Sequence, residues 1–177
     1  MRDAMDRLWA PWRMKFIGSG SKDCVFCSLP LAGEDKKSLI LSRGHHAFVM
    51  MNRYPYNNGH LMVAPFRHVL DPGDLKVNER LELWNLIGDS MSILRKTVRP
   101  SGFNIGANIG RASGAGFEHL HMHIVPRWDG DTNFMPILGE AKVIPEYLEE
   151  TYEKLLSAFP AKKAKRKGTV ALSSGKK

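Results

Sequence analysis

Three histidines occupy alternate positions in one short apolar segment: His119, His121 and His123. Successive side chains of a β-strand point to opposite faces, so a strand here would place all three imidazoles on one face, with neighbours roughly 6.5–7 Å apart. Imidazole can act as a nucleophile, exchange protons near neutral pH or bind a metal. Two other interpretations stay open: a zinc ion shared by two of the three rings, and purely structural histidines. The residues between them are expected to face a core: Leu120, Met122 and Ile124.

The turn that delivers the chain into this segment is small and rich in glycine, at residues 111–116. Glycine permits positive φ angles and close backbone approach, so exposed N–H groups in such a turn can form a nest for an anion. Beside three histidines, this composition favours a phosphate-binding loop. Pro126 is expected to end the strand, and Arg127 adds a cation.

A second segment has the pattern of a β-hairpin. Two apolar runs, 47–51 and 60–65, flank a loop of Pro, Asn and Gly residues, which are typical of turns. His60 opens the second strand and His68 lies just beyond its end.

Together these segments resemble the histidine triad (HIT) family of nucleotidyl hydrolases and transferases. Residues 119–125 match the family pattern His-φ-His-φ-His-φ-φ, where φ is apolar, at every position. Residues 52–65 also fit the pattern Asn-Arg-x-Pro-x-x-x-Gly-His-x-x-Val-x-Pro. The resemblance covers roughly residues 24–136, and residues 8–13 and 130–134 are similar to the bacterial branch that contains diadenosine tetraphosphate phosphorylases.

The resemblance implies a role for each matching residue. His121 would attack the α-phosphorus of a nucleotide and form a covalent nucleotidyl-histidine. His123 would donate to the phosphate, and His60 would be a further donor or an orienting partner. One position departs from the family, because Gly116 stands where many members carry Ser or Thr. The implied nucleotide-binding residues are Phe48 at the base, Asn52 at the ribose, Asn108 at the phosphate, and Gly114, Ala115 and Gly116 in the turn.

The two cysteines, Cys24 and Cys27, are spaced Cys-x-x-Cys. No apolar leader precedes them, which predicts a cytoplasmic protein in which a structural disulfide is disfavoured. A redox pair, a reduced buried pair and half of a zinc site are the alternatives, and a tetrahedral zinc needs two more ligands. By resemblance to zinc-bearing bacterial members, those ligands would be His68 and His119.

The rest of the pattern predicts an α+β fold with an antiparallel sheet of about five strands, and the resemblance implies that this fold is HIT-like. With 177 residues, of which 43% are hydrophobic, the chain can bury one substantial core. Apolar residues recur at helical spacing over 78–98, and a second helix is expected from Pro145 to about Ala158. The expected strands are 38–43, 47–51, 60–65, 103–108 and 119–125.

The net charge of +8 belongs mostly to the C-terminal end. Residues 161–177 hold seven of the 26 Lys and Arg residues and no acid, so the rest of the chain has 19 cations against 18 acids. We expect one domain over 1–160, with its zinc-binding segment at the start, and a disordered basic tail over 161–177. The tail is either a solvated segment or a contact for nucleic acid. No run approaches the ~18 apolar residues of a membrane span.

The resemblance and these residues predict an ATP adenylyltransferase-like enzyme that cleaves diadenosine tetraphosphate by phosphorolysis. The alternatives are a HIT-type hydrolase of AMP derivatives or of 5′-adenylated nucleic acid, and a nucleotide-binding sensor without turnover. A homodimer is expected, with Leu83 and Trp84 of the long helix as candidate contacts. Inorganic phosphate, the expected acceptor, would need cations from this set: Arg53, Arg67, Arg111, Arg127 and Lys142.

Overall fold

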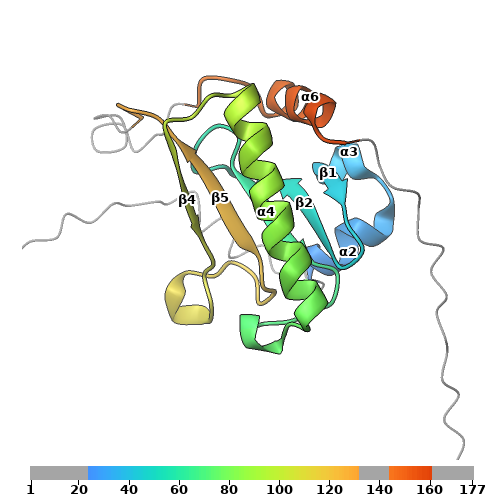
Figure 1. The fold of residues 1–177 in the computed structure, drawn as a ribbon. Coiled ribbons are helices and arrows are strands. Elements are labelled where there is room, and N and C mark those ends of the chain that lie inside the picture. The colour runs from blue at the N-terminus through green and yellow to red at the C-terminus, as the bar shows by residue number, and fades with distance from the viewer. Residues whose placement is uncertain (1–23, 132–143, 161–177) are drawn as a thin grey trace, which may run out of the picture.

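The computed structural model describes residues 24–131 and 144–160, which build a five-stranded antiparallel sheet flanked by helices (Figure 1). The predicted α+β class and the antiparallel sheet of five strands are confirmed. The basic tail at 161–177, the segment 1–23 and Lys142 lie outside the described residues. The strand order is β1 (Ile40–Arg43), β2 (Ala47–Met51), β3 (Leu61–Pro65), β5 (Met122–Arg127) and β4 (Gly102–Gly106).

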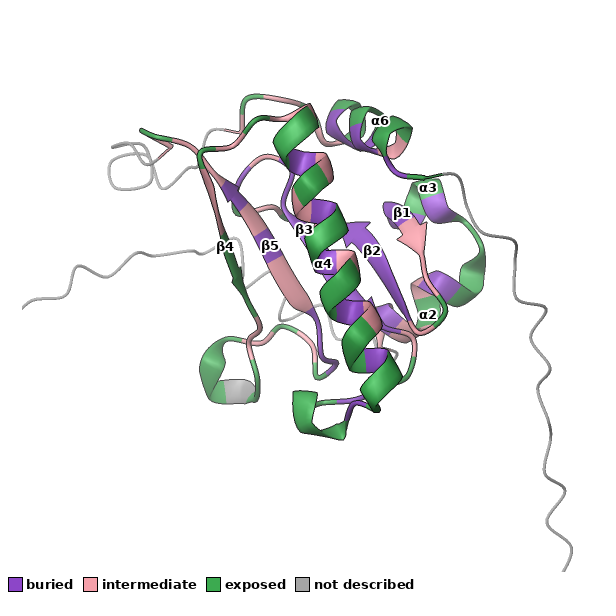
Figure 2. Cartoon of the chain, viewed as in Figure 1, coloured by how far each residue is buried: buried purple, intermediate pink, exposed green. Residues whose placement is uncertain are grey.

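One face of the sheet packs against α4 (Val77–Thr97), which crosses it diagonally in Figure 1. The buried side of α4 carries Leu83, Ile87 and Leu94. Figure 2 shows buried and exposed stretches alternating along this helix. The shorter α6 (Leu148–Ala158) packs against α4 and the β1 end of the sheet, with Leu155 fully buried. The predicted helices are therefore present, although α6 begins three residues later than expected.

The opposite face is half covered by α2 (Val25–Ala32), which the sequence analysis did not predict and which is followed by the short α3 (Asp35–Ser38). Phe26 of α2 joins a second apolar cluster with side chains from β1, β2 and β3. Pro30 inside the helix and the largely apolar sequence VFCSLPLA, which lacks a clear polar face, give a weak helical signal, so packing rather than propensity fixes this element. Within the described residues, no helix covers the same face over β5 and β4.

Strand pairing assigns side chains to these faces. Gly106 of β4 pairs with His123 of β5, which in turn pairs with Met62 of β3. Directly paired residues share a face, and residues two apart along a strand do so as well. His123 therefore lies on the face that α2 half covers, at the border between the covered and uncovered halves. Its row on β5 and β4 contains Val125, Arg127 and Asn104.

The histidine strand begins later than predicted, at Met122 instead of residue 119, and it runs through Pro126 to Arg127. The prediction that Pro126 ends the strand is wrong. Pairing with β3 stops at Ile124, so Pro126 has a strand partner only on the β4 side, where it lies opposite Phe103. A proline is tolerated there, because no ladder bond from its nitrogen is required on the vacant side. β2 has its predicted bounds, and β1, β3 and β4 differ from theirs by one or two residues at one or both ends.

No helix among the described residues is both long enough and apolar enough to cross a membrane.

Candidate active site

The three histidines divide between two sites instead of lining one strand face. His121 and His123 line a cavity and lie close together, with ring centroids 4.8 Å apart and planes at 69°. His119 precedes the strand and turns its ring toward the two cysteines. The chain bends here because the backbone N–H of Leu120 donates to the carbonyl of Val69, outside the sheet ladder.

His121 is held in the tautomer that a nucleophile requires. Its Nδ1 lies 2.7 Å from the carbonyl oxygen of His119, and a carbonyl only accepts, so Nδ1 carries the proton. The lone pair is therefore on Nε2. Burial lowers the pKa of His121, which keeps the imidazole neutral near pH 7. The ring of Phe26 stacks on it at 4.5 Å and 24°.

His123 receives its tautomer from His60, which is fully buried. The backbone N–H of Tyr56 donates to Nδ1 of His60 at 3.1 Å, so a neutral His60 carries its proton on Nε2. That Nε2 lies 2.9 Å from Nδ1 of His123 and donates to it. A neutral His123 then bears its own proton on Nε2, where it is a donor. The pair supplies an N–H group on the ring next to the nucleophile.

A cavity of about 180 Å³ opens between α2 and the sheet, and both His121 and His123 line it. Its walls are mainly apolar, with Phe26 and Phe117 among them, which suits a planar base. Among the predicted nucleotide-binding residues, the structure places Asn52, Asn108, Gly114 and Gly116 in the lining, and Ala115 lies outside it. Sequence reasoning missed the apolar lining residues Val25, Phe26, Leu29, Met50 and Met62.

Phe48 does not occupy the position expected for contact with a base. Its side chain is fully buried in the cluster under α2, and its ring stacks on Phe66 at 5.2 Å. Met50, two residues further along the same strand face, reaches the cavity instead. The resemblance thus pointed to the correct strand face, whereas the position along that face depends on α2.

A second cavity of about 390 Å³ lies over the half of the sheet formed by β5 and β4. It shares Tyr56, Asn108 and His123 with the first cavity, so the two hollows meet at these residues. Its lining is more polar in character and contains Asn57, Asn104 and Arg127.

The expected phosphate-binding cations are dispersed. Arg53 lines the first cavity and donates to the carbonyl of Lys37. Arg67 forms a two-pronged ion pair with Glu79, at 2.9 and 2.6 Å, and lines neither cavity. Arg127 lines the second cavity. The side chain of Arg111 and residue Lys142 lie outside the described part of the chain.

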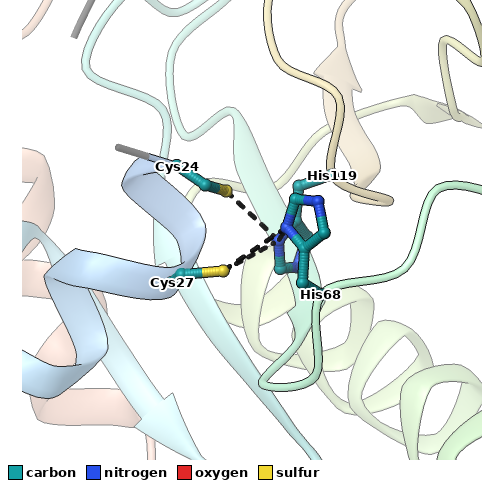
Figure 3. Close-up of side chains that lie close together, drawn as sticks. All are labelled: Cys24, Cys27, His68 and His119. Atoms are coloured by element: carbon teal, nitrogen blue, oxygen red, sulfur yellow. Dashed lines mark hydrogen bonds between the residues drawn. The ribbon is translucent and has the colours of Figure 1, made fainter. Parts of the chain in front are cut away.

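Cys24, Cys27, His68 and His119 converge on one point next to the first cavity (Figure 3), and their ligand atoms all lie within 4.8 Å of one another. Nδ1 of His119 is 3.3 Å from Sγ of Cys24 and 3.6 Å from Sγ of Cys27. Nδ1 of His68 is 3.5 Å from Sγ of Cys27 and 3.2 Å from Nδ1 of His119. A tetrahedral zinc with Zn–S of about 2.3 Å and Zn–N of about 2.0 Å sets S···N edges of about 3.5 Å and N···N edges of about 3.3 Å. The four residues thus have the spacing of a metal site.

The hydrogen bonding of His119 also suits a ligand. Its Nε2 donates to the carbonyl of Pro65 at 3.0 Å, which leaves the lone pair of Nδ1 facing the cysteines. Burial lowers the pKa of His119 to about 4, so the ring is neutral, as metal binding requires. Burial raises the pKa of the Cys27 thiol, with Cys24 adding to the shift, and a bound cation would favour its thiolate form.

Comparison with known proteins agrees with this geometry. The HIT domain model matches residues 33–130. The chain is 40% identical over 169 residues to a Mycobacterium tuberculosis protein named AP-4-A phosphorylase. The aligned region covers 89% of this chain and 86% of that protein. A Zn-bound histidine triad family protein from Mycobacterium smegmatis superposes with a TM-score of 0.62 and 26% identity, over 78% of this chain and 94% of that one. A histidine triad nucleotide-binding protein from Sulfolobus tokodaii gives a TM-score of 0.60 at 26% identity, over 76% and 88% of the two chains.

The fold and the paired histidines thus define a nucleotide-processing class of protein. The chain belongs to the HIT family.

Proposed function

We propose that this protein is a nucleotidyl transferase that cleaves diadenosine tetraphosphate through a covalent adenylyl group on His121. The observation that carries the proposal is the orientation of His121, whose Nε2 lone pair is available at the wall of a cavity suited to a base. The 40% identity to a protein named AP-4-A phosphorylase supports the choice of substrate.

In the first step, Nε2 of His121 attacks the α-phosphorus and the bond from that phosphorus to the bridging oxygen breaks. The electron pair stays on the bridging oxygen, and ATP departs. The N–H of His123, held in place by His60, donates to the phosphate oxygens as negative charge shifts onto the leaving oxygen. Asn108 and the turn at Gly114 and Gly116 line the same cavity and offer further donors.

In the second step, an oxygen of inorganic phosphate attacks the same phosphorus and the bond to Nε2 breaks, which releases ADP and restores neutral His121. Water in place of phosphate would release AMP instead. We favour phosphate because of the named relative and because Arg127 lies beside His123 in the second cavity.

The test is to incubate the protein with α-³²P-labelled diadenosine tetraphosphate, with and without inorganic phosphate, and to resolve the products. ADP and ATP with phosphate, and label retained on the protein when phosphate is absent, are the expected results. AMP and ATP at an unchanged rate would identify a hydrolase. Tight binding of nucleotide with no product would identify a sensor, and activity confined to 5′-adenylated DNA would identify a deadenylase.

We also propose that Cys24, Cys27, His68 and His119 hold one structural zinc ion. Support comes from the S₂N₂ donor set, the spacing of the four ligand atoms and the Zn-bound relative from Mycobacterium smegmatis. Zinc here would tie the start of α2 to the segment before β5. It would leave Nε2 of His121 to the nucleotide.

A homodimer remains our expectation for the assembly, with one change to its contacts. Leu83 faces the core of its own chain with 3% exposure, so it cannot contact a partner. Trp84 is 55% exposed and lies on one stripe of α4 with the exposed Val77 and Leu81. Light scattering of Trp84→Glu against the unmodified protein tests this surface, and a monomer in both samples would contradict it.

A further inference from the structure

The adenosine that is transferred is assigned to the first cavity, so the cavity over β5 and β4 is left without a role. Its position suggests one. The first cavity, on the α2 side, lies beside the nucleophile. The second begins beyond His123 and extends along the row of side chains on β5 and β4 that face away from α4. A group bound there would sit on the far side of His123 from Phe26.

The floor of this second cavity is an ordered polar network. Asp131 accepts from Nε and Nη2 of Arg127 at 2.6 and 2.7 Å, and from Nδ2 of Asn57 at 2.7 Å. Nη1 of Arg127 donates to Oδ1 of Asn104 at 2.7 Å, which leaves the amide NH₂ group of Asn104 as a donor for a ligand. The Asp131 and Asn57 side chains are largely buried, so the guanidinium is held in one orientation. Asp131 engages the edge of the guanidinium formed by Nε and Nη2, so Arg127 gives this cavity a positive charge in a fixed position, which attracts a phosphate group.

The stereochemistry of the reaction says which phosphate would bind. In phosphoryl transfer the attacking and leaving atoms lie roughly in line across the phosphorus. His121 occupies one of these two positions in both steps. The departing nucleotide in the first step and the attacking phosphate in the second must therefore use the same opposite position.

We propose that the second cavity is a phosphate-binding subsite that holds the distal phosphates of the departing nucleotide and then the acceptor phosphate. The inference rests on the proposed function and names the residues that serve its leaving and entering groups. Asp131 balances the charge of Arg127, so the subsite binds phosphate reversibly, as a departing group requires.

Gly106 offers a direct way to fill this subsite. It pairs with His123 on the same face, lines the cavity, and a Cβ added there meets no heavy atom within 4 Å. Gly106→Leu is therefore expected to fold normally while occupying space beside His123. Arg127→Gln removes the cation of the same subsite. Matched controls at exposed positions of α4, away from the stripe of Val77, Leu81 and Trp84, are Asp89→Leu and Lys96→Gln.

The experiment compares two adenylyl donors. Diadenosine tetraphosphate has a large leaving group, whereas adenosine 5′-phosphorofluoridate releases only fluoride and needs no subsite for it. We expect Gly106→Leu and Arg127→Gln to lower kcat/KM for diadenosine tetraphosphate by about tenfold or more, with the first-turnover release of fluoride within about threefold of the unmodified protein. Thermal unfolding of all variants verifies that they fold.

A second arm separates the two sources of phosphate. With the phosphorofluoridate as donor, the KM for inorganic phosphate should rise by about tenfold in both variants and stay unchanged in both controls. A lower kcat/KM for diadenosine tetraphosphate with an unchanged KM for inorganic phosphate would show that the subsite does not hold the acceptor phosphate. An equal loss of rate with both donors, or no loss with either donor, would overturn the subsite. The proposed function is tested separately, because fluoride release by the unmodified protein supports it whatever the variants do.

Discussion

The carbonyl oxygen of His119 accepts the Nδ1 proton of His121 at 2.7 Å, while the side chain of His119 belongs to the Cys/His cluster. One residue therefore joins the candidate nucleophile to the candidate metal site. A second link runs through Phe26, which lies between Cys24 and Cys27 in sequence and stacks on His121. The cluster thus fixes both the ring face and the Nδ1 partner of the nucleophile.

Replacing the nucleophile tests the mechanism most directly. His121→Gln should lower kcat by about three powers of ten or more, because no other described side chain offers a lone pair at that position. The labelled adenylyl group should no longer be retained on the protein. His45→Gln, at an exposed histidine, is the matched control. Retention of near-normal turnover by His121→Gln would rule out the covalent route.

The stacking of Phe26 on His121 predicts a loss of rate that does not depend on loss of metal. Phe26→Leu keeps the site apolar but removes the flat ring that fixes the imidazole, so kcat should fall by about tenfold, with the metal content unchanged. Phe103→Leu, on the sheet face toward α4, serves as the control for a lost phenyl ring. Metal content is measured by elemental analysis beside the kinetics. Equal kcat in the two variants would show that the stack does not position His121.

Zinc removal should destabilise the fold. We expect one zinc ion per chain in the purified protein and none in the double variant that carries both Cys24→Ser and Cys27→Ser. A bound metal stabilises the folded state, and a loss of about 3 kcal/mol would lower Tm by roughly 6–12 °C in a chain of this size. Calorimetry with and without a chelator measures this shift. The same Tm in the metal-free and metal-loaded protein would contradict a structural role.

The sequence was informative where chemistry depends on residue type and local spacing, as in the cysteine pair, His60 and the three histidines. It was less informative where a position depends on contacts distant in sequence. Phe48 lies on the correct strand face, but α2 and Phe66 enclose it, and the helical signal of α2 is weak. The late start of β5 has a similar cause, because the Leu120–Val69 hydrogen bond draws the chain out of the ladder.

Glu79 should make stability fall in acid. The two-pronged hydrogen bond from Arg67 holds the pKa of Glu79 at about 2, below its ordinary value of 4.5. The unfolded chain therefore binds a proton more readily, so the stabilisation is present above about pH 4.5 and is lost as the pH falls toward 2. Glu79→Gln should lower the free energy of unfolding by about 2 kcal/mol at pH 7, and the difference should shrink in acid. Urea unfolding at pH 7 and pH 3 measures it, with exposed Asp89→Asn as the control. A difference that is equal at both pH values would contradict this origin.

The hydrogen bond from His60 to His123 predicts different effects for two substitutions of the same buried ring. His60→Leu removes the donor, so the proton of His123 is free to move to Nδ1 and its Nε2 ceases to donate to the phosphate. Loss of one such donor lowers kcat by about a hundredfold, with a smaller effect on KM. His60→Gln carries an NH₂ group near the position of the imidazole Nε2, so it should restore the donation and recover about tenfold of the lost rate. Both variants disturb the contact with the backbone N–H of Tyr56, so thermal unfolding should show losses of stability for both. If Leu and Gln lower kcat equally, His60 supports the fold alone and does not set the proton position on His123.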